Sequence, residues 1–199
     1  MKYKKILISG GAGFIGSNLA LKLIEKGCSV TVLDNLSPQI HGDNSPLYNS
    51  VKDKVHLIKG SVLSYDDWNK ALDGVEVVIH LAAETGTGQS MYEIEKYTDV
   101  NIKGTSIFVD ILENEKHSVK KMIIASSRSI YGEGKYSCSK DGIVYPNERK
   151  DTDMANGDFN VKCPICNENA KLLATDESSK IHPSSIYGIT KQVQEQMFM

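Results

Sequence analysis

The chain has 199 residues, of which 40% are hydrophobic, and its formal net charge is -2. This composition allows one substantial hydrophobic core, so we expect one principal domain, and the near-neutral charge argues against a nucleic-acid-binding surface. An apolar run of about 18 residues is absent from the sequence, and glycines interrupt the apolar start too early for a signal peptide, so we expect a soluble cytoplasmic protein with no membrane partner.

A glycine-rich turn follows the first predicted strand. Residues 4–9 (KKILIS) are typical of a short buried strand, and an apolar helical pattern begins at Leu19. Between them, Gly10, Gly13 and Gly16 form G-x-x-G-x-x-G, which differs by one residue from the G-x-G-x-x-G pattern of dinucleotide-binding proteins. Glycines allow a tight turn and let a pyrophosphate approach the backbone N–H groups at a helix start. The motif predicts a dinucleotide site.

An acidic residue ends the second predicted strand. Residues 29–33 (SVTVL) run into Asp34 and Asn35. A carboxylate at this strand end can accept hydrogen bonds from both hydroxyls of the adenosine ribose, and it would repel the 2′-phosphate of NADP. NAD is therefore the favoured cofactor. In the alternative interpretation, the glycines form a plain loop and Asp34 forms a turn.

The rest of the chain continues the alternation of strands and helices. We expect strands at 55–59, 76–80 and 121–125, a short helix at 65–72 and a long helix from about 90 to 115. Short apolar strands separated by helices are typical of a parallel sheet covered on both faces. The predicted fold class is α/β, a doubly wound (Rossmann) parallel sheet. Ligands bind such sheets beyond the carboxyl ends of the strands, and the residues expected at that edge are Gly10, Asp34, Ala82 and Ser127.

A tyrosine and a lysine stand one helical turn apart close to the end of the chain. In the sequence YGITK, Tyr187 and Lys191 place a phenol and an ammonium group on one helical face. A neighbouring cation favours the ionised form of a phenol, which can then act as a general base. Because such a pair can equally be a solvated surface pair, the motif needs support from the rest of the chain.

Six motifs span nearly the whole chain: GGAGFIGSNL, LDN, HLAA, NIKGT, SSRSIYG and YGITK. Together they resemble the extended short-chain dehydrogenases/reductases of the nucleotide-sugar epimerase and dehydratase group. Within that group, residues 38–48 and 86–101, with the later SIYGEGKYSC and CPIC sequences, look most like dTDP-L-rhamnose 4-epimerase-type members.

The resemblance implies roles for individual residues. Ser127 corresponds to the catalytic Ser/Thr that hydrogen-bonds the reacting sugar oxygen, Tyr187 to the proton-transferring base, and Lys191 to the group that holds the nicotinamide ribose. The residues that it places at NAD are Gly10, Gly13, Phe14, Ile15, Gly16, Asp34, Asn35, Ser61, Val62, Leu81, Ala82, Ala83, Asn101, Tyr187 and Lys191. Those that it places at the sugar are Thr87, Gln89, Ser90 and Ser127.

One position departs from the pattern of the resembled group. Ser61 stands where that group usually has an Asp that touches adenine. Adenine recognition is therefore expected to be weaker there, or to use backbone groups.

The implied reaction is NAD-dependent 4-epimerisation of a dTDP- or UDP-linked hexose, for cell-surface polysaccharide biosynthesis. Tyr187 would remove the proton of the 4-hydroxyl while hydride leaves C4, and the keto sugar would turn over before the hydride returns to its other face. A 4,6-dehydratase is the alternative among enzymes, but that group usually carries Asp-Glu after the catalytic Ser/Thr, where this chain has Arg128-Ser129. The second functional class is a non-catalytic NAD-binding module with a zinc knuckle.

A long polar stretch, 133–183, separates Ser127 from Tyr187, and a structureless loop of this length would be unusual. Cys163-x-x-Cys166 forms a knuckle, and the Cys138-x-x-Asp141 sequence is similar to a degenerate partner. Zinc accepts three thiolates and one carboxylate in a tetrahedral site. We therefore expect a zinc ribbon with the ligands Cys138, Asp141, Cys163 and Cys166. A metal-free remnant and a redox pair are the alternatives.

Members of the resembled group continue past the Tyr-Lys helix into a smaller C-terminal substrate domain, whereas this sequence ends at Met199. We expect residues 1–199 to form an NAD-binding Rossmann domain with the 133–183 insertion, to lack most of the sugar site, and to bind NAD without epimerase turnover. The resemblance also implies a homodimer through the helices at 90–115 and 184–199. The spacing of Tyr92, Tyr97, Val100, Ile107 and Ile111 fits core packing equally well.

Overall fold

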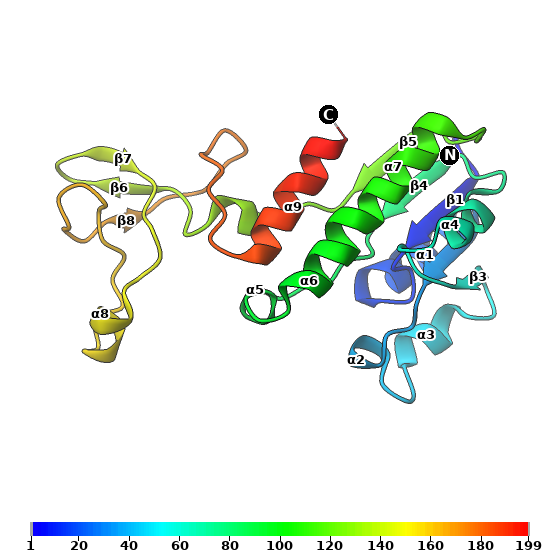
Figure 1. The fold of residues 1–199 in the computed structure, drawn as a ribbon, viewed down its shortest axis with the longest axis horizontal. Helices are drawn as coiled ribbons and strands as arrows, with labels where there is room; N and C mark the ends of the chain where they lie inside the picture. The colour runs from blue at the N-terminus through cyan, green and yellow to red at the C-terminus, as the bar shows by residue number, and fades with distance from the viewer. Residues whose placement is uncertain (1, 199) are drawn as a thin grey trace. The chain divides into compact units, whose positions relative to one another are not determined.

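The computed structural model describes residues 2–198 (Figure 1). The chain forms two compact units. Unit 1 contains the residues up to Glu84, residues 95–126 and the residues from Val193 onward. Unit 2 contains residues 85–94 and 127–192. None of the helices within residues 2–198 is long and apolar enough to cross a membrane.

A five-stranded parallel sheet forms the centre of unit 1, in the order β3-β2-β1-β4-β5. Its strands are β1 (Lys5–Ser9), β2 (Ser29–Asp34), β3 (His56–Lys59), β4 (Val77–His80) and β5 (Lys121–Ile124). All five predicted strands and the doubly wound α/β class are therefore confirmed. The strand order reverses at β1, where the chain returns from β3 to place β4 on the other side, and this reversal is where such sheets bind ligands.

Helices cover both faces of this sheet. Those of unit 1 are α1 (Phe14–Glu25), α2 (Pro38–His41), α3 (Pro46–Val51), α4 (Tyr65–Leu72), α6 (Ile94–Tyr97) from Glu95 onward, and α7 (Gly104–Asn114). Ile6 and Ile8 of β1 pack with residues of α1 and α3, whereas Leu7 packs with Trp68 of α4 and Phe108 of α7. Side chains of a strand alternate between faces, so one strand contributes to both cores.

The predicted helix from about 90 to 115 is partly wrong. A short helix, α5 (Thr87–Ser90), ends first, and the long helical run begins at Ile94 and contains a π-helical segment, η1 (Thr98–Lys103). Apolar spacing gives no signal for such an extra residue per turn, because the residues on either side keep an apolar face. Tyr97 and Ile111 of this run are buried in unit 1, as core packing requires.

A buried polar network crosses the core of unit 1. His80 Nδ1 lies 2.6 Å from Ser9 Oγ, and its Nε2 lies 3.3 Å from Thr105 Oγ1. The Thr105 hydroxyl donates to the Asn101 carbonyl at 2.6 Å and accepts from Gln194 Nε2 at 2.6 Å. Because a hydroxyl has one proton, Thr105 must also accept at its contact with His80, which places a proton on His80 Nε2. In the neutral imidazole, Ser9 then donates to Nδ1.

Unit 2 contains a second, smaller sheet. Its strands β6 (Tyr136–Cys138), β7 (Gly142–Val144) and β8 (Lys171–Leu172) are antiparallel in the order β7-β6-β8. The unit also holds the 3-10 helix η2 (Arg128–Tyr131), α8 (Asp151–Ala155) and the first part of α9 (Ile186–Met197). The 133–183 insertion is thus folded, with a small core around Tyr136, Val144 and Val161.

We predict that Thr105→Val lowers the free energy of unfolding by about 1–3 kcal/mol, because the buried groups around Thr105 lose their hydrogen bonds to its hydroxyl. Urea denaturation measures the loss. Ser106→Ala, which removes an exposed hydroxyl one residue later on α7, is the control and should change stability by at most about 0.5 kcal/mol. Equal effects of the two substitutions would contradict the assignment of the network.

Candidate functional site

The glycine turn after β1 is shaped by close backbone contacts. Gly10 has φ +70° and donates its N–H to the Leu33 carbonyl at 2.8 Å. A Cβ at Gly10 would lie 2.8 Å from the backbone nitrogen of Ala82, and one at Gly16 would collide with the Gly10 carbonyl. Gly13 precedes α1 and provides no side-chain cap. The turn therefore leaves the N–H groups of the first turn of α1 available to an anion.

Asp34 joins the end of β2 to this turn. Its Oδ2 accepts a hydrogen bond from the Ala12 N–H at 2.9 Å, and its Oδ1 accepts one from the Leu36 N–H at 2.9 Å. His41 Nε2 lies 3.4 Å from Oδ1, and both side chains are 7% exposed. His41 was not predicted at this site because the histidines of the sequence have no ligand spacing, although the Pro38-to-Gly42 turn returns it to Asp34.

The position that departs from the family pattern, Ser61, has an acidic neighbour. The Ser61 N–H donates to Asp67 Oδ2 at 3.0 Å, and this hydrogen bond holds the pKa of the Asp67 carboxyl below its usual range. Asp67 was not predicted from the sequence, since it lies in the first turn of α4 rather than at the strand end. Val62 is buried and accepts a hydrogen bond from Trp68 Nε1 through its carbonyl.

The segment after β4 is held from two sides. The N–H groups of Leu81 and Ala82 donate to the carbonyl and hydroxyl of Ser9. Asn101, on the π-helical segment, accepts from the Glu84 N–H at 2.8 Å and donates to the Glu84 carbonyl at 3.1 Å. Asn101 is fully buried, and its two hydrogen bonds hold the backbone of Glu84, which directly follows the predicted cofactor segment 81–83.

At this edge of the sheet, two of the residues predicted to contact NAD are exposed: Phe14 at 74% and Ile15 at 63%. Asn35 is also exposed, and its Oδ1 accepts from the Ser37 N–H. Ala83 lies between the two anchored ends of its segment and is half-buried. Apart from Asn101 on the π-helical segment, the predicted cofactor residues of unit 1 therefore lie at or after the carboxyl ends of β1, β2, β3 and β4, as a doubly wound sheet requires.

Unit 2 holds the predicted catalytic residues. Ser127 Oγ caps η2 by accepting from the Ser129 N–H at 3.1 Å. Tyr187 and Lys191 lie one turn apart on α9, and Lys191 is 4% exposed. The residue after Tyr187 is Gly188, where an added Cβ would lie 2.7 Å from the Ser129 carbonyl. This close backbone approach brings the start of α9 against the turn that follows Ser127.

The predicted sugar residues Thr87, Gln89 and Ser90 lie on α5 in the same unit. Ser90 is fully buried; its hydroxyl donates to the Thr87 carbonyl at 2.6 Å and accepts from the Tyr187 N–H at 3.1 Å. This contact fixes the backbone of Tyr187 to α5. The four predicted metal ligands also come together in unit 2, with their ligand atoms all within 4.8 Å of one another.

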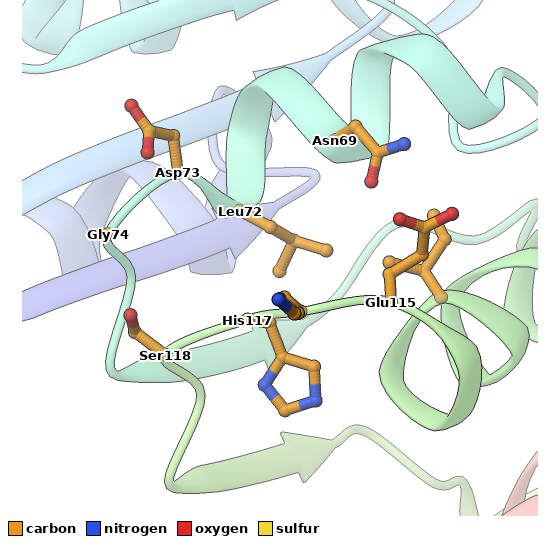
Figure 2. A pocket seen from close by; sticks show the side chains of 9 residues that line it. Asn69, Leu72, Asp73, Gly74, Glu115, His117 and Ser118 are labelled. Carbon is orange, nitrogen blue, oxygen red and sulfur yellow. The ribbon is translucent and has the colours of Figure 1, made fainter.

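A separate hollow of about 510 Å³ lies in unit 1 (Figure 2). It is lined from the end of α4 by Leu72 and Asp73, and from the segment after α7 by Glu115 and His117. These segments precede β4 and β5, so the hollow is at the amino ends of the strands. It contains none of the predicted cofactor or catalytic residues.

Residues 6–149 match the model of the NAD dependent epimerase/dehydratase family. The chain belongs to this family. Among curated family relatives, it is 36% identical to a dTDP-L-rhamnose 4-epimerase from Burkholderia thailandensis, over 96% of this chain and 52% of that protein. It is 35% identical to a UDP-glucose 4-epimerase from Bacillus subtilis, over 64% of this chain and 38% of that protein.

The epimerase/dehydratase family assignment agrees with solved structures. A UDP-glucose 4-epimerase from Brucella ovis in complex with NAD superposes with a TM-score of 0.69 at 25% identity, covering 98% of this chain and 46% of that chain. The enzyme from Thermotoga maritima with UDP-glucose gives 0.66 at 27% identity, covering 97% and 49%. The chain therefore spans about half the length, or less, of these family members.

We predict that Gly188→Ala destabilises the start of α9, because the new methyl group would lie 2.7 Å from a backbone oxygen and 3.0 Å from Pro183 Cβ. The expected loss is about 1–3 kcal/mol of unfolding free energy, measured by denaturation followed by circular dichroism. Gly88→Ala on α5 is the control, because an added Cβ there meets nothing within 4 Å. A loss no larger than that of the control would refute the close approach of α9 to Ser129.

Proposed function

We propose that these residues form the NAD-binding and proton-transfer part of a nucleotide-sugar 4-epimerase. The observation that carries the proposal is the seating of Gly188 against the Ser129 carbonyl, since it brings the Tyr-Lys helix to the turn capped by Ser127. The named activities of the epimerase relatives support the same reaction class. The proposed substrate is a dTDP- or UDP-linked hexose, with dTDP-L-rhamnose favoured because that relative aligns along nearly the whole chain.

The proposed chemistry assigns one task to each side chain. Tyr187 accepts the proton of the sugar 4-hydroxyl, and Lys191, one turn further along α9, holds the nicotinamide ribose. The Ser127 oxygen already accepts from the Ser129 N–H, so its own proton is available for the sugar oxygen. NAD, when bound, supplies the acceptor and donor of hydride at C4. Tyr187 would return its proton to the 4-oxygen when the turned keto sugar is reduced again at the opposite face of C4, which gives the C4 epimer.

The cofactor residues of unit 1 fit NAD. Asp34 is oriented by two backbone N–H groups, and a carboxylate with about four lone-pair sites keeps acceptor capacity for ribose hydroxyls. Its negative charge disfavours the 2′-phosphate of NADP. The uncapped first turn of α1 provides N–H groups for the pyrophosphate.

The dehydratase alternative is weaker at the residues after Ser127. Arg128 donates through Nη2 to the Gly132 carbonyl, and the Ser129 N–H donates to the Ser127 hydroxyl. Neither side chain supplies the acid and base that the Asp-Glu pair of the resembled dehydratases provides. A non-catalytic NAD-binding module remains the second class, and it would need no fixed contact between Gly188 and Ser129.

Zinc is the ion that we propose for the cluster of Cys138, Asp141, Cys163 and Cys166. A homodimer through the helices at 90–115 and 184–199 is supported by exposed apolar side chains on α6 and α9, Ile94 and Ile189. A cytoplasmic location and a part in cell-surface polysaccharide biosynthesis complete the proposal.

We predict that Asp34→Asn weakens NAD binding by about tenfold to a hundredfold, because hydrogen bonds to a charged acceptor contribute about 1.5–3 kcal/mol. The preference for NAD over NADP should fall as well. Isothermal calorimetry with each dinucleotide measures both effects, and Asp53→Asn, at an exposed position of unit 1, is the matched control. Unchanged NAD affinity in Asp34→Asn would remove Asp34 from the cofactor site.

We predict that Tyr187→Phe lowers kcat by roughly 10²- to 10⁴-fold in the protein that contains these residues, because the general base is lost. NAD affinity should change much less, since the adenosine half of the site is intact. Interconversion of dTDP-L-rhamnose and its C4 epimer, followed by NMR, gives the rate. Tyr65→Phe, which removes a phenol that donates to Glu115 in unit 1, is the control. Full activity of Tyr187→Phe would exclude it as the base.

A further inference from the structure

Four side chains of unit 2 converge with the geometry of a metal site. Cys138 Sγ lies 3.4 Å from Cys166 Sγ and 3.3 Å from Asp141 Oδ2, and Cys163 Sγ lies 3.1 Å from the same oxygen. Around a tetrahedral zinc ion, with zinc–sulfur bonds of about 2.3 Å, ligand atoms are separated by about 3.6–3.8 Å. The four atoms, all within 4.8 Å of one another, need only small adjustments to reach that arrangement.

The two halves of the cluster have the same backbone design. The Lys140 N–H points at Cys138 Sγ at 3.4 Å, and the Ile165 N–H points at Cys163 Sγ at 3.4 Å, so each sulfur receives an N–H from two residues further on. Asp141 therefore takes the place in the first knuckle that Cys166 takes in the second.

The fold around the second knuckle does not fit a redox pair. Reactive C-x-x-C pairs owe their low thiol pKa in part to a helix N-terminus. Cys163 and Cys166 instead lie in a turn, closed by hydrogen bonds from Cys163 N–H to Glu168 and from Asn167 N–H to Cys163. Asn167 is in the left-handed region with φ +61°. This is a tight loop between short paired segments.

The surrounding core is too small to hold the insertion together. Its buried members are Tyr136, Cys138, Val144, Val161 and Cys163. Two of these five are the cysteines themselves, and β8 has only two residues. Small modules with so little apolar core fold stably when a disulfide or a metal links their segments. Structural zinc supplies that free energy directly.

We propose that Cys138, Asp141, Cys163 and Cys166 together bind one zinc ion, and that this ion fixes the segment joining Ser127 to Tyr187 in the shape that the catalytic pair requires. The second half of this statement rests on the proposed function. The first half is independent of it.

Contacts within unit 2 carry the effect from the ion to the start of α9. Close to the cluster, the outgoing and returning chains are joined at Lys135. Its N–H donates to Thr175 Oγ1 at 3.2 Å, its carbonyl accepts from the Leu173 N–H at 2.9 Å, and its ammonium lies 3.0 Å from Asp176. These bonds clamp the returning chain just after β8.

Nearer the catalytic residues, the same two chains are joined again. The His182 N–H donates to the Ile130 carbonyl at 2.9 Å. A Cβ at Gly132, which has φ +54°, would lie 2.6 Å from the His182 carbonyl. Gly188 then packs on Ser129. When the ion is removed, the two knuckles at the far end of the insertion are no longer linked to each other. The outgoing and returning chains can then shift relative to one another, which weakens these paired contacts.

The first experiment measures metal content. The 199-residue chain, purified under reducing conditions without chelator, is expected to contain one zinc per chain by elemental analysis. Cys163→Ser should lose the metal, whereas Cys28→Ser, at a buried cysteine of unit 1, should retain it. Since Cys163→Ser can fail to fold, Asp141→Cys provides a second test and should bind zinc at least as tightly. A chain that takes up no zinc even when zinc is supplied, with its thiols free or paired as a disulfide, overturns the site.

The second experiment measures the coupling by amide hydrogen exchange with and without a zinc chelator. Exchange at the His182 and Tyr187 amides, which bond to Ile130 and Ser90, should accelerate by about tenfold or more when zinc is removed. The Val78 amide in β4 should not change. Bound zinc with unchanged exchange at His182 and Tyr187 overturns the coupling. NAD affinity and turnover are measured separately, so a failure of the proposed function leaves the metal result intact.

Discussion

Parallel pairing of β2, β1 and β4 places the carboxyl ends of these strands at one edge of the sheet, and the candidate cofactor site depends on that constraint. Ser9, Asp34 and His80 end the three strands. From there, Asp34 binds the Ala12 N–H of the glycine turn, and Ser9 binds the N–H groups of the segment after β4. The same few backbone hydrogen bonds therefore close the turn, orient the carboxylate and position residues 81–83.

Behind that edge, buried polar side chains form directional hydrogen bonds that orient the groups they join, which apolar packing cannot do. Ser9, His80, Thr105 and Gln194 form a hydrogen-bonded line through the core, between the stacked rings of Trp68 and Phe108 and the strand ends. The π-helical segment sets Asn101 so that both ends of its amide reach the backbone of Glu84. Each hydrogen bond has a direction, so the network selects one register of the long helix against the sheet.

Unit 2 is held together by close backbone contacts and hydrogen bonds, because its strands are short and its core is small. Glycines at 132 and 188 permit backbone approaches that any side chain would block, and hydrogen bonds at Lys135 and His182 hold the two chains of the insertion together. The cysteine cluster stands at the far end of these paired chains. In the family to which the chain belongs, the relative named a dTDP-L-rhamnose 4-epimerase aligns over 96% of the chain, and so across most of the insertion, whereas the alignment with the Bacillus subtilis relative covers 64%.

The sequence by itself determined the five strands, the glycine turn, Asp34 at the end of β2 and the two knuckles, because each of these is encoded within a few consecutive residues. Apolar runs, glycine spacing and C-x-x-C spacing are local signals. The tertiary structure alone decided that His41 and Asp67 lie against Asp34 and Ser61, that a π-helical segment interrupts the long helix, and that Gly188 meets Ser129 across 59 residues of sequence. These contacts join residues far apart in the chain or on different turns, and their partners are chosen by packing and by hydrogen-bond direction, which no local pattern records.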